Sequence, residues 1–205
     1  MAPKYKLIYF DTEGLGEPIR FLFAYAGVPY EDFRFKREDW PKHKDSAPFG
    51  KVPLLEVDGK TVHQSVAICR YLANQFKLAG DNAWESVQCD MLIDSFGDLR
   101  DLVNKLFYEQ DEEKRVQILK DLRKDTFPYY LKKFDEVIAK NNGHFVAGKL
   151  TWCDLYIVCL LDVIQGRLKE DIVVKDYPNV KKIYDTVMNL PAIKAWVAKR
   201  PKQQK

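Results

Sequence analysis

The chain has 205 residues, of which 46% are hydrophobic and 31% charged, a composition typical of folded domains. Its 33 basic and 30 acidic residues are interleaved and give a formal net charge of only +3, which argues against a nucleic-acid-binding surface. No apolar run approaches the about 20 residues of a membrane-spanning helix, and the first residues lack the apolar segment of a signal peptide. We therefore expect a folded cytoplasmic protein that binds neither nucleic acid nor membrane.

The first third of the chain alternates strand and helix patterns. Residues 4–10 predict a strand, and Glu17-Pro18 opens an apolar helix that Gly27 ends. Residues 30–36 alternate aromatic and charged side chains as a second strand does, and the polar residues 37–47 predict a loop. A hairpin over 52–63 with Asp58-Gly59 at its turn and a helix over 65–76 follow. This order predicts an α/β domain of the thioredoxin-like kind.

The rest of the chain shows helical periodicity only. Turn-forming residues at 78–84 predict a linker. Apolar residues then recur at helical spacing over 85–108, 113–140, 152–166, 178–189 and 192–199. We therefore expect a thioredoxin-like domain over 1–78, a linker over 79–84 and an all-α domain over 85–205.

Cysteine and histidine positions indicate no metal or redox centre. The four cysteines include no CxxC pair and lie in apolar helical patterns, so packed thiols are expected. No zinc-ligand spacing joins them to the three histidines, and we expect no bound metal. Gly14-Leu15-Gly16 lacks the further residues of a phosphate-binding loop.

Three places in the sequence can be interpreted before any family is considered. Ser65 stands at a predicted helix start, where unpaired N–H groups and the helix dipole favour an anion, although a simple helix cap has the same pattern. Thr151-Trp152-Cys153-Asp154 has the spacing of a capping box, which indicates a folding role. Tyr9, at the end of the first strand, reads by itself as a core aromatic residue.

The segments Pro48-Phe49-Gly50-Lys51-Val52-Pro53-Leu54-Leu55 and His63-Gln64-Ser65-Val66-Ala67-Ile68 resemble the glutathione site of cytosolic glutathione transferases. The whole chain is similar to the sigma class, which includes haematopoietic prostaglandin D synthases and insect transferases. The resemblance implies a homodimer in which the thiolate of glutathione, the co-substrate, attacks hydrophobic electrophiles, with peroxidase activity on lipid hydroperoxides as a further option.

Tyr9 matches the catalytic tyrosine of that family. A thiol with a pKa of about 8.5 is mostly protonated at pH 7. A fixed O–H donor that favours the anion raises the nucleophilic fraction. The resemblance also implies a cis peptide bond before Pro53, next to the cysteinyl part of glutathione.

The resemblance assigns two groups of residues. Those implied to bind glutathione are Tyr9, Trp40, Lys44, Lys51, Val52, Pro53, Gln64 and Ser65, together with Asp98, which reaches the γ-glutamyl amino group of the partner subunit's site. Those implied to line the electrophile pocket are Phe10, Thr12, Leu15, Asn104, Phe107, Tyr108 and the region from Leu160 to Ile164.

Three positions depart from the prostaglandin D synthases. Gly97 interrupts their metal-binding aspartates and leaves Asp94 and Asp98, Lys105 stands near the place of their pocket tryptophan, and Leu15 replaces an arginine. Prostaglandin isomerisation is therefore the alternative to general conjugation. A non-catalytic role as a ligand-binding or crystallin-like structural protein is the other.

Overall fold

The computed structural model describes residues 3–201 and contains a four-stranded sheet above a layer of helices. The strands are β1 (Tyr5–Phe10), β2 (Glu31–Phe35), β3 (Leu54–Val57) and β4 (Lys60–His63). Their order across the sheet is β2-β1-β3-β4; β1 pairs in parallel with β2, and the other pairs are antiparallel. The crossover between β1 and β2 contains α1 (Glu17–Ala26), and α3 (Ser65–Gln75) follows β4. The predicted thioredoxin-like arrangement is confirmed.

Local sequence explains where these elements begin and end. Pro18 lies in the first turn of α1, where its missing N–H costs nothing, and Gly27 ends the helix at a φ of 64°. Asp58 and Gly59 both have positive φ, as the tight turn of the β3–β4 hairpin requires.

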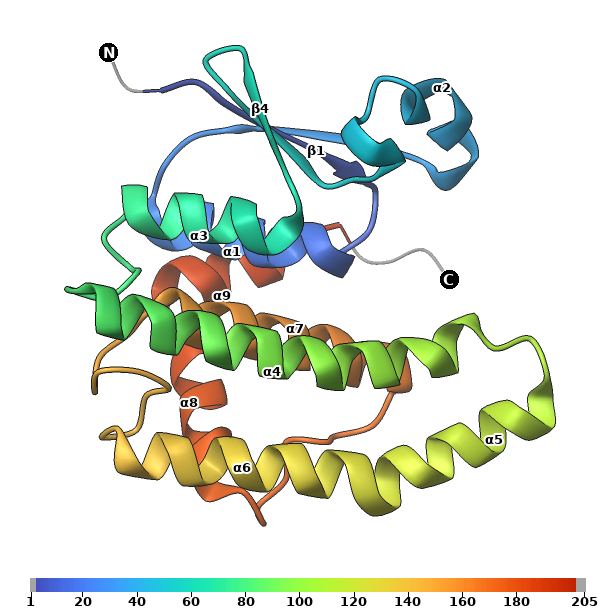
Figure 1. Cartoon of the computed structure of the whole chain (residues 1–205), viewed down its shortest axis with the longest axis vertical. Helices are drawn as coiled ribbons and strands as arrows, with labels where there is room; N and C mark the ends of the chain where they lie inside the picture. Colours follow the sequence, from blue (N-terminus) through green and yellow to red (C-terminus); the bar gives the residue numbers. More distant parts are fainter. Residues whose placement is uncertain (1–2, 202–205) are drawn as a thin grey trace.

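The helical part of the chain packs below α1 and α3 (Figure 1). Its helices are α4 (Ala83–Tyr108), α5 (Glu112–Asp121), α6 (Phe127–Lys140), α7 (Trp152–Leu168), α8 (Pro178–Met188) and α9 (Pro191–Lys199). Helix α7 is buried on nearly all sides and lies against α1, α3, α4 and α8. A single hydrophobic core therefore runs from the sheet through α1 to the helical layer.

Three local predictions need correction. The segment 37–47, predicted as a loop, contains a 3₁₀ turn (Arg37–Asp39) and the short helix α2 (Trp40–Lys44). The helix predicted over 113–140 is divided by a π-helical turn at Leu122–Thr126, just before Pro128, which has no N–H for regular helical bonding. Helix α4 begins two residues earlier than predicted, because the Asn82 side chain caps it by accepting the Glu85 N–H at 3.0 Å.

The capping box of α7 is confirmed. The Asp154 carboxylate is fully buried and accepts hydrogen bonds from the Thr151 N–H at 2.7 Å, the Thr151 hydroxyl at 3.0 Å and the Phe145 N–H at 3.1 Å. It fixes the start of the central helix. Within residues 3–201, none of the helices combines the length and the apolar character required to cross a membrane.

Candidate active site

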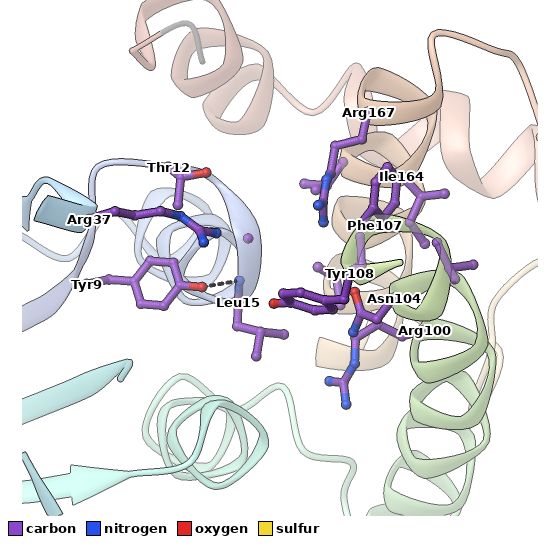
Figure 2. Close-up of a pocket in the computed structure, with 14 residues that line it drawn as sticks. Tyr9, Thr12, Leu15, Arg37, Arg100, Asn104, Phe107, Tyr108, Ile164 and Arg167 are labelled. Atoms are coloured by element: carbon purple, nitrogen blue, oxygen red, sulfur yellow. Dashed lines mark hydrogen bonds between the residues drawn. The ribbon is translucent and has the colours of Figure 1, made fainter. Parts of the chain in front are cut away.

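The hydroxyl of Tyr9 is held at the turn between β1 and α1. Tyr9 is buried near the end of β1, and the backbone N–H of Leu15 donates a hydrogen bond to its oxygen at 3.1 Å (Figure 2). A phenol oxygen that accepts one hydrogen bond still has its own proton to donate. The geometry therefore leaves the Tyr9 O–H available to an acceptor such as a sulfur anion.

Gly14 and Gly16 leave the space that the Tyr9 ring occupies. A Cβ added to Gly14 would lie 2.7 Å from the Tyr9 oxygen, and one added to Gly16 would lie 2.5 Å from Cδ1 of the ring. Both distances are shorter than real Cβ atoms show, so the ring packs directly against the backbone of the 3₁₀ turn Gly14–Gly16. Gly14-Leu15-Gly16, which lacks the further residues of a phosphate-binding loop, thus forms the backbone surface against which the Tyr9 ring packs.

The surroundings keep Tyr9 protonated. Burial raises the pKa of its hydroxyl, while the Leu15 N–H and the positive charge of Arg20 act weakly in the opposite direction, and the net effect is a raised pKa. At neutral pH, Tyr9 is therefore a hydrogen-bond donor and carries no charge.

A cavity of about 180 Å³ lies beside the start of α3. We call it the cis-proline cavity, because the Val52–Pro53 peptide bond is cis, as predicted. Ser65 is the buried first residue of α3, and Gln64 precedes it with a φ of 70°. Five residues predicted to bind glutathione come together here with Leu15 and His63; they are Lys51, Val52, Pro53, Gln64 and Ser65.

Trp40 and Lys44 lie on α2 and do not line the cis-proline cavity. The Trp40 ring stacks on Phe35 at a centroid distance of 6.0 Å. The Lys44 side chain lies over the turn at Gly50, with its Cε 3.6 Å from the position of a Cβ there. Lys44 is thus near the turn that leads into Lys51, whereas Trp40 packs against the end of β2.

A second cavity of about 260 Å³, the Tyr9 pocket, opens between the β1–α1 turn and the helical domain (Figure 2). Leu15 lines both cavities, so the Tyr9 hydroxyl lies next to their shared wall. The lining residues are Tyr9, Thr12, Gly14, Leu15, Arg37, Arg100, Val103, Asn104, Phe107, Tyr108, Leu160, Val163, Ile164 and Arg167.

Phe10, predicted to line this pocket, is not among its lining residues. Successive side chains of a strand point to opposite faces, so Phe10 cannot share the direction of Tyr9. It packs instead against Trp40 and Phe35, with centroid distances of 5.5 and 4.9 Å.

Three arginines of the pocket were not identified from the sequence. Arg100 shares a face of α4 with Asn104 and Phe107, so helical spacing from those residues would have found it. Arg167 lies one turn after Ile164 on α7 by the same logic. Arg37 gave no signal, because its segment reads as a polar loop and only the chain fold brings it to Tyr9.

Asp98 lies exposed on α4 and lines neither cavity of its own chain. Asp94 is exposed one turn earlier. Across the described residues, no group of three or more His, Cys, Asp or Glu side chains is arranged to hold a metal ion.

Comparison with known proteins agrees with this geometry. Residues 5–74 match the model of the glutathione S-transferase N-terminal domain, and residues 97–200 match that of the C-terminal domain. A glutathione S-transferase of Anopheles gambiae is 41% identical over 199 residues, which cover 97% of this chain and 98% of that protein. Hematopoietic prostaglandin D synthase of Gallus gallus is 41% identical over 201 residues, 98% of each chain.

A solved structure of prostaglandin synthase D of Nilaparvata lugens superposes with a TM-score of 0.92 at 45% identity, covering 98% of this chain and 100% of that one. The matches thus extend over both domains and nearly from end to end. The chain belongs to the glutathione transferase family.

Proposed function

We propose that the chain is a sigma-class glutathione transferase in which Tyr9 stabilises the thiolate of bound glutathione for attack on hydrophobic electrophiles. Members of this family are transferases with glutathione as co-substrate. The observation that carries the proposal is the Tyr9 hydroxyl, which keeps its proton free beside the wall between two cavities. The cis-proline cavity is lined by five residues predicted to bind glutathione, and the Tyr9 pocket has apolar side chains on its walls.

In the proposed complex, glutathione lies in the cis-proline cavity. Its γ-glutamyl carboxylate meets Ser65 and the N-terminus of α3, where N–H groups are unpaired. Its cysteinyl backbone pairs beside Val52 and Pro53, with Gln64 orienting the peptide. Lys44, Lys51 and Trp40 lie near the glycyl end, where a cation favours the carboxylate.

The proposed reaction takes place where the cavities meet. The sulfur lone pair forms a bond to the electrophilic atom while the leaving group departs with its electron pair. Tyr9 donates its hydrogen bond to the sulfur anion before attack, so the thiolate exists at neutral pH. Apolar residues of the Tyr9 pocket, such as Leu15, Phe107 and Ile164, hold the electrophile.

The decisive test replaces Tyr9 by phenylalanine. Conjugation of 1-chloro-2,4-dinitrobenzene at pH 7 should fall about a hundredfold or more, because the thiol loses its fixed donor. The pKa of the bound thiol should rise toward about 8.5, so the residual activity increases with pH. Glutathione affinity, measured by calorimetry, should change little.

Tyr5→Phe is the matched control, because Tyr5 lies on the same strand and points the same way but lines neither cavity. It should retain full activity. Equal pH profiles for Tyr9→Phe and the wild type would remove the proposed mechanism.

We also propose a homodimer formed through one face of α4. Trp84, Val87 and Met91 are exposed at helical spacing, and Trp84 and Met91 leave 70% and 60% of their surface accessible. Asp98 continues the same face two turns further along. A second copy that covers this apolar stripe therefore brings Asp98 near the partner, as its predicted contact with the partner's glutathione requires.

Asp98→Ala should weaken glutathione binding about tenfold, because a charged hydrogen bond to the γ-glutamyl amino group is lost. The fold should remain intact, since Asp98 is exposed and has no ion pair among the described residues. Calorimetry measures the affinity, and sedimentation measures the mass. Asp121→Ala, an exposed change on α5, is the control. Unchanged affinity in Asp98→Ala would contradict the contact.

The second candidate function is glutathione-dependent prostaglandin D synthesis. It is favoured by the relatives named prostaglandin D synthase and opposed by Leu15 and Lys105, which depart from that group. Incubation with prostaglandin H2 and glutathione, with product analysis by mass spectrometry and with and without magnesium, separates isomerisation from conjugation. Lipid hydroperoxides test the peroxidase option in the same way. Absence of every turnover would favour the ligand-binding or crystallin-like role.

We also propose a domain division and a location in the cell. The division into 1–78, 79–84 and 85–205 places the linker between α3 and α4, although Ala83 and Trp84 already lie in α4. The cytoplasmic location follows the cytosolic transferases that the sequence resembles, and cell fractionation tests it.

A further inference from the structure

The Tyr9 pocket has an excess of positively charged side chains in its lining. Arg37, Arg100 and Arg167 line it, and none of its lining residues is acidic. Arg100 is already paired, because its guanidinium binds Asp101 at 3.0 Å. Arg37 and Arg167 form no ion pair within residues 3–201, although the protein contains 30 acidic residues. Two guanidinium groups therefore reach the pocket without a counter-ion.

The two arginines come from different parts of the fold and point into the same space. Arg37 follows β2 and extends beside Tyr9, whereas Arg167 extends from α7 on the opposite side (Figure 2). Both side chains line the same cavity of about 260 Å³. Burial lowers the pKa of Arg167, and the positive charge of Arg37 acts in the same direction.

Aromatic rings hold both guanidinium groups. The Arg167 group lies 3.6 Å from the centroid of the Phe107 ring, and the Arg37 group lies 5.7 Å from that of Phe10. Cation–π contacts fix the direction of a planar guanidinium while leaving its N–H donors free. Both side chains remain exposed to solvent, but these ring contacts and their place in the pocket lining direct the two guanidinium groups into the cavity.

We propose that the Tyr9 pocket selects electrophiles that carry a carboxylate, which Arg37 and Arg167 bind while the apolar walls hold the rest of the molecule. This inference rests on the proposed function, because it names the substrate class of the same pocket. A guanidinium presents two parallel N–H donors that match the two oxygens of a carboxylate. The volume of about 260 Å³ suits a small substituted ring or a short chain.

The test compares two electrophiles that differ only in this charge, 4-chloro-3,5-dinitrobenzoate and its methyl ester. In both, the glutathione sulfur bonds to the ring carbon that bears chlorine, and chloride leaves with the electron pair. The measured quantity is kcat/KM for the acid divided by that for the ester, each normalised to its uncatalysed reaction with glutathione. The wild type should favour the acid.

Arg37→Gln and Arg167→Gln should each lower this ratio about tenfold, the effect of one lost charged hydrogen bond. Any effect of Arg37 on the nearby Tyr9 or on the thiolate changes both electrophiles alike and cancels in the ratio. Arg115→Gln is the matched control, because Arg115 pairs with Glu112 on the exposed side of α5. Its ratio should equal that of the wild type.

Failure of the inference is distinguishable from failure of the proposed function. Two results would overturn the carboxylate site while leaving the transferase intact. One is that both arginine variants turn over the ester and keep the wild-type ratio of kcat/KM for acid and ester. The other is that the wild type prefers the ester. If neither compound reacts, the proposed function fails. The affinities of the two glutathione conjugates, measured by calorimetry, then test the carboxylate site separately. Tighter binding of the carboxylate conjugate, lost in both arginine variants, would support the site, and equal affinities would reject it.

Discussion

At the scale of single residues, the position of the Tyr9 hydroxyl depends on what its neighbours lack. The missing side chains of Gly14 and Gly16 let the ring lie against the turn, and the backbone N–H of Leu15 then reaches the phenol oxygen. Burial keeps the group protonated. A hydrogen-bond donor aimed at a fixed point is thus built from a strand residue and the turn that follows it.

Gly16→Ala tests this arrangement. The new Cβ would lie 2.5 Å from the Tyr9 ring, so the ring must move, and the hydroxyl moves with it. Conjugation of 1-chloro-2,4-dinitrobenzene should fall at least about tenfold, because a displaced donor loses most of its effect. Steady-state kinetics measure the loss.

Gly166→Ala is the control for that change. A Cβ at Gly166, inside α7, meets no atom within 4 Å, so this variant should keep its activity and gain slightly in stability. A fully active Gly16→Ala enzyme would show that the position of Tyr9 is not critical.

Residues of the candidate site differed in how far sequence could reveal them. Pro53, Gln64 and Ser65 lie in one short stretch with a family motif, and they do meet at one cavity. Phe10 was predicted to line the Tyr9 pocket from its proximity in sequence to Tyr9, but strand side chains alternate between faces and Phe10 is not among the lining residues. Arg37 was missed because its contact with the pocket exists only through the folded chain.

At the scale of elements, α7 organises the helical half, and its start depends on one buried carboxylate. Asp154 accepts hydrogen bonds from Thr151 and Phe145 and lies 3.3 Å from the His144 ring nitrogen. It joins the helix to the loop before it. A change there affects the element around which the others pack.

Asp154→Ala should lower the free energy of unfolding by about 3 kcal/mol or more, because several buried N–H and O–H donors lose their acceptor. Urea unfolding followed by circular dichroism measures the difference. Asp111→Ala removes an N-cap aspartate from the exposed start of α5, where Asp111 accepts the Lys114 N–H, and should cost about 1 kcal/mol. Equal losses of unfolding free energy in the two variants would mean that the burial of Asp154 does not strengthen its contribution to stability.

Most elements were predictable because each carries its own periodicity and its own end signals. The sheet strands, α1, α3 and α7 follow apolar spacing bounded by proline, glycine or a cap. The π-helical turn before Pro128 was not, because proline signals an interruption without saying how the backbone absorbs it. The short helix α2 lacks an apolar face and so leaves no pattern.

At the scale of the molecule, a buried charge network joins the two domains. Glu17, the first residue of α1, accepts hydrogen bonds from Trp196 at 2.8 Å and from Arg20 at 3.1 Å. Arg200, 3.3 Å from Glu17, also donates to Asp162 on α7 at 2.8 Å. Residues up to 183 positions apart thus share one carboxylate, a contact that no local pattern in the sequence could predict.

Glu17→Ala should destabilise the whole chain by about 3 kcal/mol or more, since the fully buried Arg20 loses a charged partner. Fluorescence and circular dichroism should show one coincident urea transition at lower denaturant, because a single core spans both domains. Glu31→Ala breaks the exposed pair with Lys6 and should cost less than about 1 kcal/mol. Separate transitions for the two domains would contradict this coupling.

Leu15 lines both the Tyr9 pocket and the cis-proline cavity. In the proposed reaction, the conjugate would occupy the two cavities simultaneously and so combine the affinities of both halves in one molecule. The arrangement proposed to bring the two reactants together would therefore also hold their product. For electrophiles that fit the Tyr9 pocket best, we therefore expect release of the conjugate to be slower than bond formation, so that kcat should fall as the viscosity of the solvent rises.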